Sequence, residues 1–230
     1  MKTYNLYLES GPKMRKTMVH VPALMGCTAR GDTTEAALAA TPDAIRAYLR
    51  FLARHGESID AEAPVRTRIA EHITQGTFLG NGAVFLPTDT ASLSARESDA
   101  LMKRLSALHD ELRRLTGGLS ATQLGARPSK GRTIRQILQH VCCEGAYLRG
   151  VSGASRIQRE VDEGRLDPHD AIDRLLDLET ARLRAMTATE RTEVIMRGQS
   201  PWSARSALRK MLEHAWEHYT EIAERLGASP

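Results

Sequence analysis

The first 90 residues contain several short segments with the polarity pattern of β-strands. Residues 3–9, 16–22 and 65–73 are predicted to be strands, and the first and last of these alternate in polarity with a period of two. A shorter third strand is indicated at 27–30, between glycines that mark a tight connection. Gly80-Asn81-Gly82 indicates a turn before a short apolar run. We therefore expect a small sheet in this part of the chain.

One helix is predicted within the same region, because apolar residues recur at helical spacing over 33–54. Asp32 is the predicted N-cap, with Glu35 three residues later in the arrangement of a capping box. Pro42 lies inside this segment. The sequence leaves open whether the helix kinks there or two short helices meet.

After about residue 90 the strand signals stop and the apolar period becomes that of a helix. The leucines between positions 101 and 115 recur at steps of four and three, as one buried helical stripe requires. Residues 151–167 are expected to be irregular or to hold a short helix. Four amphipathic helices are predicted, at 94–116, 132–150, 168–187 and 203–227.

These patterns predict an α+β protein with two domains. Residues 1–90 are expected to form a small α/β domain, and residues 91–230 an all-α four-helix bundle. A length of 230 residues is consistent with two domains.

Charge and cysteine content narrow the classes of function. The net charge of +4 is spread thinly, as +1 over residues 1–90 and +3 over residues 91–230, so a nucleic-acid partner is not expected. Cys27, Cys142 and Cys143 cannot make a disulfide framework, and free thiols favour the cytoplasm. The sequence has neither a signal-peptide pattern nor an apolar run long enough to span a membrane, so no membrane association is expected.

A histidine constellation carries the candidate chemistry. His214 and His218 are four residues apart on the last predicted helix, so they lie on one face at the edge of its apolar stripe. His140 has a similar place on the helix at 132–150, and three imidazoles converge if the two helices pack side by side. Three protein ligands with an open position are typical of catalytic metal sites. A non-functional interpretation is also open for each residue. His214 and His218 are then a pair of histidines on one helix face, and His140 is a partly buried core histidine.

The neighbours of these histidines leave several roles open. Glu144 lies one turn after His140 and is predicted to orient an imidazole or accept a proton, unless it is only a rim residue. Cys143 is a metal ligand, a nucleophile or an ordinary thiol. The remaining histidines have no helical partner and are expected to be ordinary; they are His20, His55, His72, His109 and His169.

The segments 133–148 and 201–218 resemble the second and fourth helices of the DinB superfamily of metal-binding four-helix bundles. The resemblance implies that His140, His214 and His218 bind a divalent transition metal, most readily Zn or Ni. It also implies a homodimer and, as in thiol-dependent members, a low-molecular-weight thiol as co-substrate. Imidazole ligands alone do not distinguish these metals from Cu or Fe.

Residues 21–38 resemble the HicB-like antitoxin fold, through a Pro-x-x-x-Gly-Cys turn and a Gly-Asp-Thr helix start. Where antitoxins of that family carry a DNA-binding domain, this chain has the DinB-like helices instead. The resemblance implies an interaction domain that binds a protein partner or a second copy.

Two functions follow from these features. The first is a metal-dependent transferase or hydrolase that activates a thiol or water against a small electrophile, with Glu144 as catalytic residue and Tyr147 and Arg205 as substrate contacts. The second is a non-enzymatic interaction module with a structural or sensory metal. A fourth protein ligand would favour the second function, and an open position the first.

Overall fold

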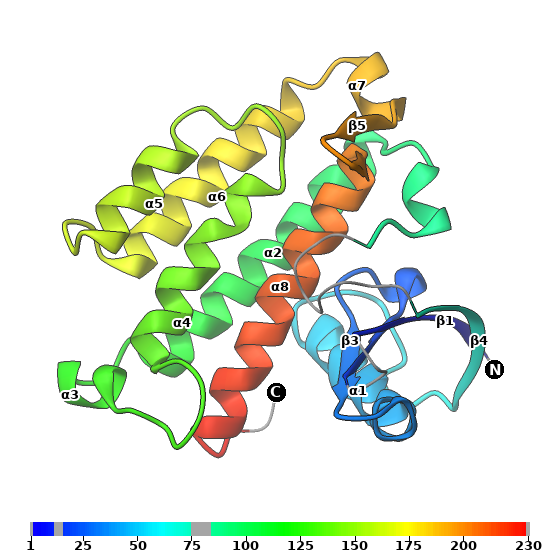
Figure 1. Ribbon diagram of the computed structural model, residues 1–230, viewed down its shortest axis with the longest axis horizontal. Helices are drawn as coiled ribbons and strands as arrows, with labels where there is room; N and C mark the ends of the chain where they lie inside the picture. The colour runs from blue at the N-terminus through cyan, green and yellow to red at the C-terminus, as the bar shows by residue number, and fades with distance from the viewer. Residues whose placement is uncertain (1, 12–15, 75–83, 229–230) are drawn as a thin grey trace.

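The computed structural model describes residues 2–11, 16–74 and 84–228. It has a small four-stranded sheet with one long helix, followed by a helical bundle (Figure 1). The predicted α+β class is confirmed. The turn predicted at 80–82 lies outside the described residues.

The sheet has the strand order β3-β2-β1-β4. Strand β1 (Lys2–Ser10) is central and pairs antiparallel with β2 (Thr17–His20) and parallel with β4 (Val65–Ile73). Strand β3 (Thr28–Gly31) pairs antiparallel with β2, so the short strand indicated at 27–30 is confirmed. A short 3-10 turn, η2 (Pro22–Leu24), separates β2 from β3.

Helix α1 (Thr34–Arg54) is continuous across Pro42, so the chain does not break into two short helices. The predicted cap at Asp32 is wrong by one residue. Thr33 is the N-cap, because its extended backbone lets its Oγ1 accept a hydrogen bond from the backbone N–H of Ala36 at 3.1 Å.

The four predicted bundle helices are present. They are α2 (Ala95–Thr116), α4 (Ile134–Val141), α6 (Pro168–Arg184) and α8 (Ala204–Arg225). Helix α2 packs on α6 and α8, and α4 packs on the same two helices. The helix predicted to run to residue 150 ends at Val141, because the chain tightens there into a 3-10 turn, η4 (Cys142–Ala146).

Several short elements connect the long helices. A β-hairpin after residue 90 was not expected from the sequence, and its strands are only three residues long. The connecting elements are η3 (Pro87–Thr90), α3 (Ala121–Gly125), α5 (Ala154–Asp162), α7 (Ala188–Thr192), β5 (Ile195–Arg197) and β6 (Ser200–Trp202).

Helix α8 lies between the bundle and the N-terminal region (Figure 1). Trp216 of α8 is buried against two rings of α1, with centroid distances of 4.8 Å to Tyr48 and 5.5 Å to Phe51. One hydrophobic cluster therefore runs across both regions. No helix in the described ranges is both long and apolar enough to cross a membrane.

Candidate metal centre

Helix α8 holds two histidines rigidly on its inner face. Ser203 caps the helix, with its Oγ accepting from the N–H of Ser206 at 3.0 Å. His214 and His218 follow in the middle of the helix and are both buried. Their ring centroids are 4.6 Å apart and the ring planes are perpendicular, as for two imidazoles one helical turn apart that meet edge to face.

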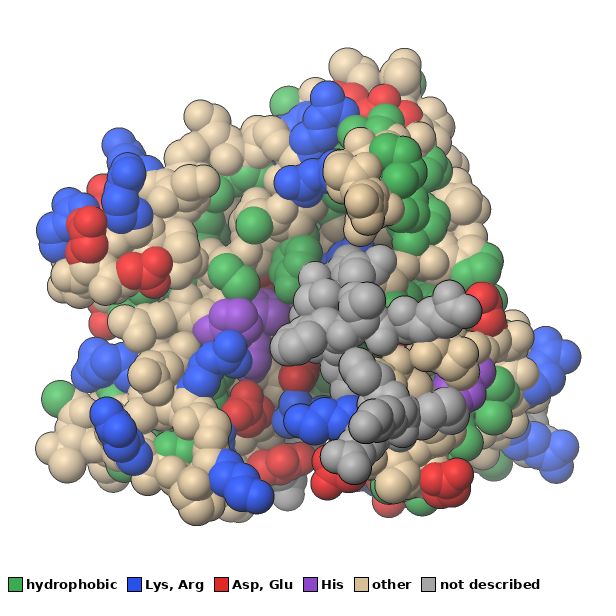
Figure 2. All heavy atoms as spheres, in the orientation of Figure 1, with side chains coloured by type: hydrophobic (Ala, Val, Ile, Leu, Met, Phe, Trp, Pro, Cys, Tyr) green, Lys and Arg blue, Asp and Glu red, His purple; other side chains and the backbone are tan. Residues whose placement is uncertain are grey.

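His140 completes the cluster from the last turn of α4. Its ring centroid lies 5.0 Å from that of His214 and 5.1 Å from that of His218. One ligand nitrogen of each residue lies within 4.8 Å of the other two. Nitrogens bound to one tetrahedral ion at about 2.1 Å are about 3.4 Å apart, so small side-chain adjustments suffice to bring the three onto one ion. Figure 2 shows histidine side chains reaching the surface near the middle of this face.

The ring nitrogens are suited to receive a cation. Neither nitrogen of His214 has a hydrogen-bond partner among the described residues, although the ring is buried. A buried polar atom without a partner is costly, and a bound ion would remove that cost. His218 Nδ1 is 3.1 Å from Glu221 Oε2, so its Nδ1–H donates to the carboxylate and Nε2 is left for the metal.

Burial favours the neutral, metal-binding form of His140 and His214. Desolvation, with a further contribution from Arg132 and His218, lowers the pKa of His140 to about 4. Desolvation also lowers the pKa of His214 well below its usual range, and the two neighbouring imidazoles add to this shift. Neutral imidazole is the form that binds metals, so at neutral pH these two rings need not lose a proton first.

Glu144 is placed in the core of the bundle. Its side chain is fully buried, and its Oε1 lies 2.8 Å from His109 Nε2. Burial, with the nearby Glu144 charge, raises the pKa of Glu179 well above its usual range. His109 therefore belongs to a buried polar cluster and is not an ordinary surface histidine. The catalytic role of Glu144 stays a prediction.

Cys143 is the half-buried residue of the adjacent cysteine pair. Its Sγ lies 3.7 Å from His140 Nδ1, but it does not join the three histidines as a fourth ligand. Burial, followed by the charge of Glu144, raises the pKa of Cys143 to about 11. The thiol is therefore protonated at neutral pH.

The two predicted substrate contacts are placed differently. The Tyr147 ring lies 5.8 Å from the His214 ring, next to the cluster. Arg205 lies in the first turn of α8, nine residues before His214, and donates to the carbonyl oxygen of Ser92 at 2.8 Å and to Glu97 at 2.6 Å. These contacts tie the helix start to the preceding chain. The substrate-binding roles of both residues stay predictions.

A narrow cleft borders His214 on the side of the sheet, with Tyr147, Lys210 and Glu217 in its lining. His20 of β2 also lines this cleft. It was expected to have no special role, but its Nδ1 lies 3.0 Å from Glu213 Oε1. Burial, followed by the charge of Arg209, lowers the pKa of Lys210 to about 8.

Sequence reasoning did not single out Glu221, His20 or Lys210. The role of Glu221 could have been predicted from the sequence, because a carboxylate three residues after a histidine lies on the same helix face. The contact between His20 and Glu213 joins residues 193 positions apart, which no local pattern indicates.

Comparisons with known proteins place the chain in a family. The search of solved structures found one described as "YfiT from Bacillus subtilis is a probable metal-dependent hydrolase with an unusual four-helix bundle topology". Its sequence is 21% identical to this one, the match covers 60% of this chain and 92% of that chain, and the TM-score is 0.44. A curated relative, UPF0150 protein Ta0767 of Thermoplasma acidophilum, is 48% identical over 42 residues, or 18% of this chain. The matched part of the chain spans 61% of that relative's length. The sequence model of the DinB superfamily matches residues 98–222, which is more than half of the chain, and the protein therefore belongs to the DinB superfamily.

Proposed function

We propose that this protein is a metal-dependent enzyme in which His140, His214 and His218 hold one divalent transition metal ion. Zn and Ni are the first candidates for this ion. The observation that carries the proposal is the convergence of three imidazoles whose ligand atoms lie within 4.8 Å of one another. His214 supports it, because both of its buried ring nitrogens are without a hydrogen-bond partner among the described residues, and such nitrogens suit a bound cation better than an apolar core.

An open coordination position favours catalysis over a structural role. Within the described parts of the chain, no cysteine, aspartate, glutamate or further histidine joins the group. Glu144 is turned toward His109, and Cys143 contacts His140 from outside the cluster. Structural sites of this type are usually closed by four protein ligands.

The residues around the centre have separable tasks in this proposal. When bound, a divalent ion would bring the pKa of a coordinated thiol or water toward neutrality. Glu221 holds His218 in the tautomer that offers Nε2. Beside His214, Tyr147 and Lys210 line the narrow cleft, whose volume of about 30 Å³ admits a water molecule or one small polar group of a substrate.

The reaction that we propose is displacement on a small electrophilic molecule: the sulfur of an activated thiol or the oxygen of water forms the new bond, and the bond between the electrophilic carbon and its leaving group breaks. With a low-molecular-weight thiol as co-substrate, the product is a thioether or thioester and the protein is an S-transferase. With water, the protein is a hydrolase. In both cases the thiol or water loses its proton, and Lys210, whose pKa is lowered by burial to about 8, can take up that proton in the fraction of molecules in which its amine is neutral and pass it to the leaving group.

We also propose that the boundary between the regions lies near residue 90 and that the N-terminal region is a HicB-like domain. The segment 21–38 follows β2, contains β3 and includes the start of α1, and this strand–strand–helix order supports the assignment. Its proposed role is contact with a protein partner or with a second copy in a homodimer.

Metal analysis tests the proposed centre. The purified protein is expected to carry one transition metal ion per chain, and the variant with His140, His214 and His218 all changed to Ala is expected to lose it. A matched control changes His55, His72 and His169 to Ala, three imidazoles outside the cluster, and keeps its metal. Equal metal content in both triple variants would contradict the proposal.

A cobalt-substituted protein tests whether the position is open. The Cys143→Ser variant is used, so that its own thiol cannot contribute. Addition of 2-mercaptoethanol is expected to produce a sulfur-to-cobalt charge-transfer band, because a thiolate can enter only an open position. An unchanged spectrum at saturating thiol would favour the structural or sensory role.

A further inference from the structure

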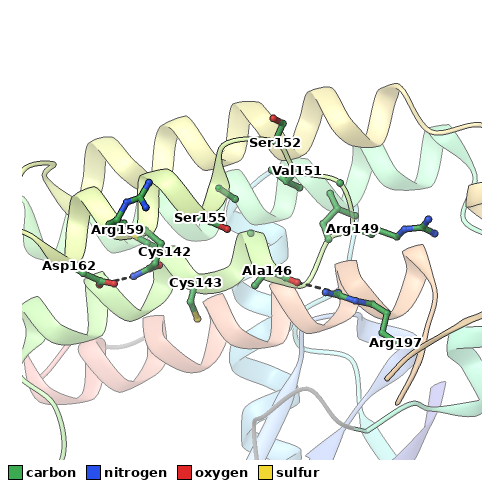
Figure 3. A pocket seen from close by; sticks show the side chains of 15 residues that line it. Cys142, Cys143, Ala146, Arg149, Val151, Ser152, Ser155, Arg159, Asp162 and Arg197 are labelled. Carbon is green, nitrogen blue, oxygen red and sulfur yellow. Dashed lines mark hydrogen bonds between the residues drawn. The ribbon is translucent and has the colours of Figure 1, made fainter. Parts of the chain in front are cut away.

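A pocket of about 670 Å³ opens beside the metal centre, and its size is typical of small-molecule sites (Figure 3). The chain from η4 to the first residues of α5 forms one wall, and the rest of α5 forms a second. Arg197 of β5 closes one end, with its guanidinium directed at Ala146 in Figure 3.

Cys143 connects this pocket to the histidine cluster. Its side chain lines the pocket, and its Sγ is 3.7 Å from His140 Nδ1. Its neighbour Cys142 is buried, and its thiol donates to the carbonyl oxygen of Leu138 inside the core. A molecule that touches Cys143 from the pocket is therefore separated from His140 by a single side chain.

The charged groups of the lining are mostly cationic. The lining contains three arginines, Arg149, Arg159 and Arg197, and one acidic residue, Asp162. Arg149 already has a partner, since its Nη1 donates to Glu193 Oε1 at 3.2 Å. The pocket therefore carries an excess of positive charge.

Within the described parts of the chain, two of these guanidinium groups have no carboxylate partner. Arg197 donates to the carbonyl oxygen of Ala146 at 3.3 Å, and neither it nor Arg159 forms an ion pair with a described residue. Figure 3 shows them toward opposite ends of the lining, with Cys143 between them. The planar fork of Arg is suited to bind carboxylates with two parallel hydrogen bonds.

We propose that this pocket binds a small carboxylate-bearing molecule, with Arg159 and Arg197 as its anchors and the Cys143 side of the pocket directed at the metal centre. Two separated guanidinium groups favour a molecule with two carboxylates. Its assignment as a substrate rests on the metal-dependent reaction proposed above, whereas its binding does not.

Alkylation of Cys143 by iodoacetamide reports on occupancy of the pocket. Cys27 and Cys142 are 1% and 2% exposed, so Cys143 is the most accessible thiol of the three. Because its raised pKa leaves little thiolate at neutral pH, the alkylation is run at mildly alkaline pH, and the Cys143 peptide is followed by mass spectrometry. Succinate is expected to slow this alkylation in a saturable manner at constant ionic strength. The double variant R159Q/R197Q is expected to raise the half-saturating succinate concentration about five- to tenfold, as loss of two charge-assisted contacts at a solvent-exposed site implies.

Matched controls separate binding from general charge effects. The R156Q variant removes an arginine on the same helix whose partner is Glu160, and it is expected to behave like the parent protein. Succinamide, the neutral analogue, is expected to give no protection. Absence of saturable protection by succinate, or equal protection in all variants, would overturn the proposal. Stronger protection by inorganic phosphate than by succinate would overturn the carboxylate assignment.

Metal-depleted protein makes this test independent of the proposed reaction. Succinate protection in that protein is expected to equal that of the metal-loaded protein, because the arginines lie outside the histidine cluster. Succinate protection in a protein that does not bind metal would support the proposed pocket and contradict only the proposed metal-dependent activity. Metal binding without succinate protection of Cys143 would support the proposed metal centre and contradict only the proposed carboxylate pocket.

Discussion

Glu221 offers the sharpest test of how this chain tunes its metal centre. Its Oε2 lies 3.1 Å from His218 Nδ1, and its Oε1 accepts a hydrogen bond from Arg225 on the next turn of α8. A carboxylate behind a ligating imidazole fixes the tautomer and raises the basicity of the ligand nitrogen. Its removal is therefore expected to weaken metal binding while the three ligands stay in place.

The expected size of the effect follows from the contact. Loss of such a partner costs 10–100-fold in metal affinity, and Glu221 is 21% exposed, so we expect Glu221→Ala to weaken Zn²⁺ binding about 20-fold, or about 1.8 kcal/mol. Glu221→Gln keeps an acceptor but loses the charge. Since a neutral hydrogen bond has about half the strength of a charge-assisted one, we expect about a fivefold loss.

Competition with a chromophoric chelator at neutral pH measures these affinities. Glu224→Gln is the matched control, because Glu224 is exposed on the same helix and has no contact with the histidines. The order of affinity is expected to be parent, then Gln, then Ala. A Glu221→Ala variant that is folded by circular dichroism and binds Zn²⁺ as tightly as the parent would refute the reasoning.

Three further predictions concern stability, measured by urea unfolding. Gly26 has φ +104°, and a Cβ there would lie 2.3 Å from Tyr48 Oη, so Gly26→Ala is expected to lower the free energy of unfolding by about 3 kcal/mol or more. Arg209→Met leaves Asp89 and Glu213 buried without their cation and is expected to cost about 3–5 kcal/mol. Burial alone would raise the pKa of Glu213, but its cationic neighbours, Arg209 first, hold it below 4.5. This carboxylate therefore stabilises the fold above pH 4.5 and loses that effect as the pH falls through its folded pKa, so Glu213→Gln is expected to flatten the pH dependence in that range; an equally steep loss in the variant would contradict this.

The elements that the sequence predicts well are those with a long, one-sided apolar pattern. Helix α8 matches its predicted start and nearly its predicted end, because both its cap and its stripe are local features. The hairpin of β5 and β6 has strands of three residues, too short for any period to appear. Helix α4 ends at Val141, and the 3-10 turn that follows it carries Glu144, whose contact with His109 joins distant parts of the chain and leaves no local pattern.

The candidate site likewise has residues that local sequence patterns predict and residues that only contacts between distant parts of the chain bring together. The spacing of His214 and His218 on one helix predicts their shared face, and the structure brings His140 to them. The partners that set the charge around them come from elsewhere. His20 approaches Glu213 from the sheet, and a single side chain of this kind leaves no trace in the periodicity of either element.

The N-terminal region and the metal centre are joined through α8. Glu213 and Trp216 point toward the sheet and α1, whereas His214 and His218 on the same helix point toward α4. With 3.6 residues per turn, neighbouring positions face different sides, so one helix presents its ligands to the bundle and its anchors to the first region. Without that region, Trp216 would lose its aromatic neighbours on α1 and Glu213 its histidine partner. The orientation of the helix that carries two of the three proposed ligands therefore depends on residues that are distant from the family's own segment.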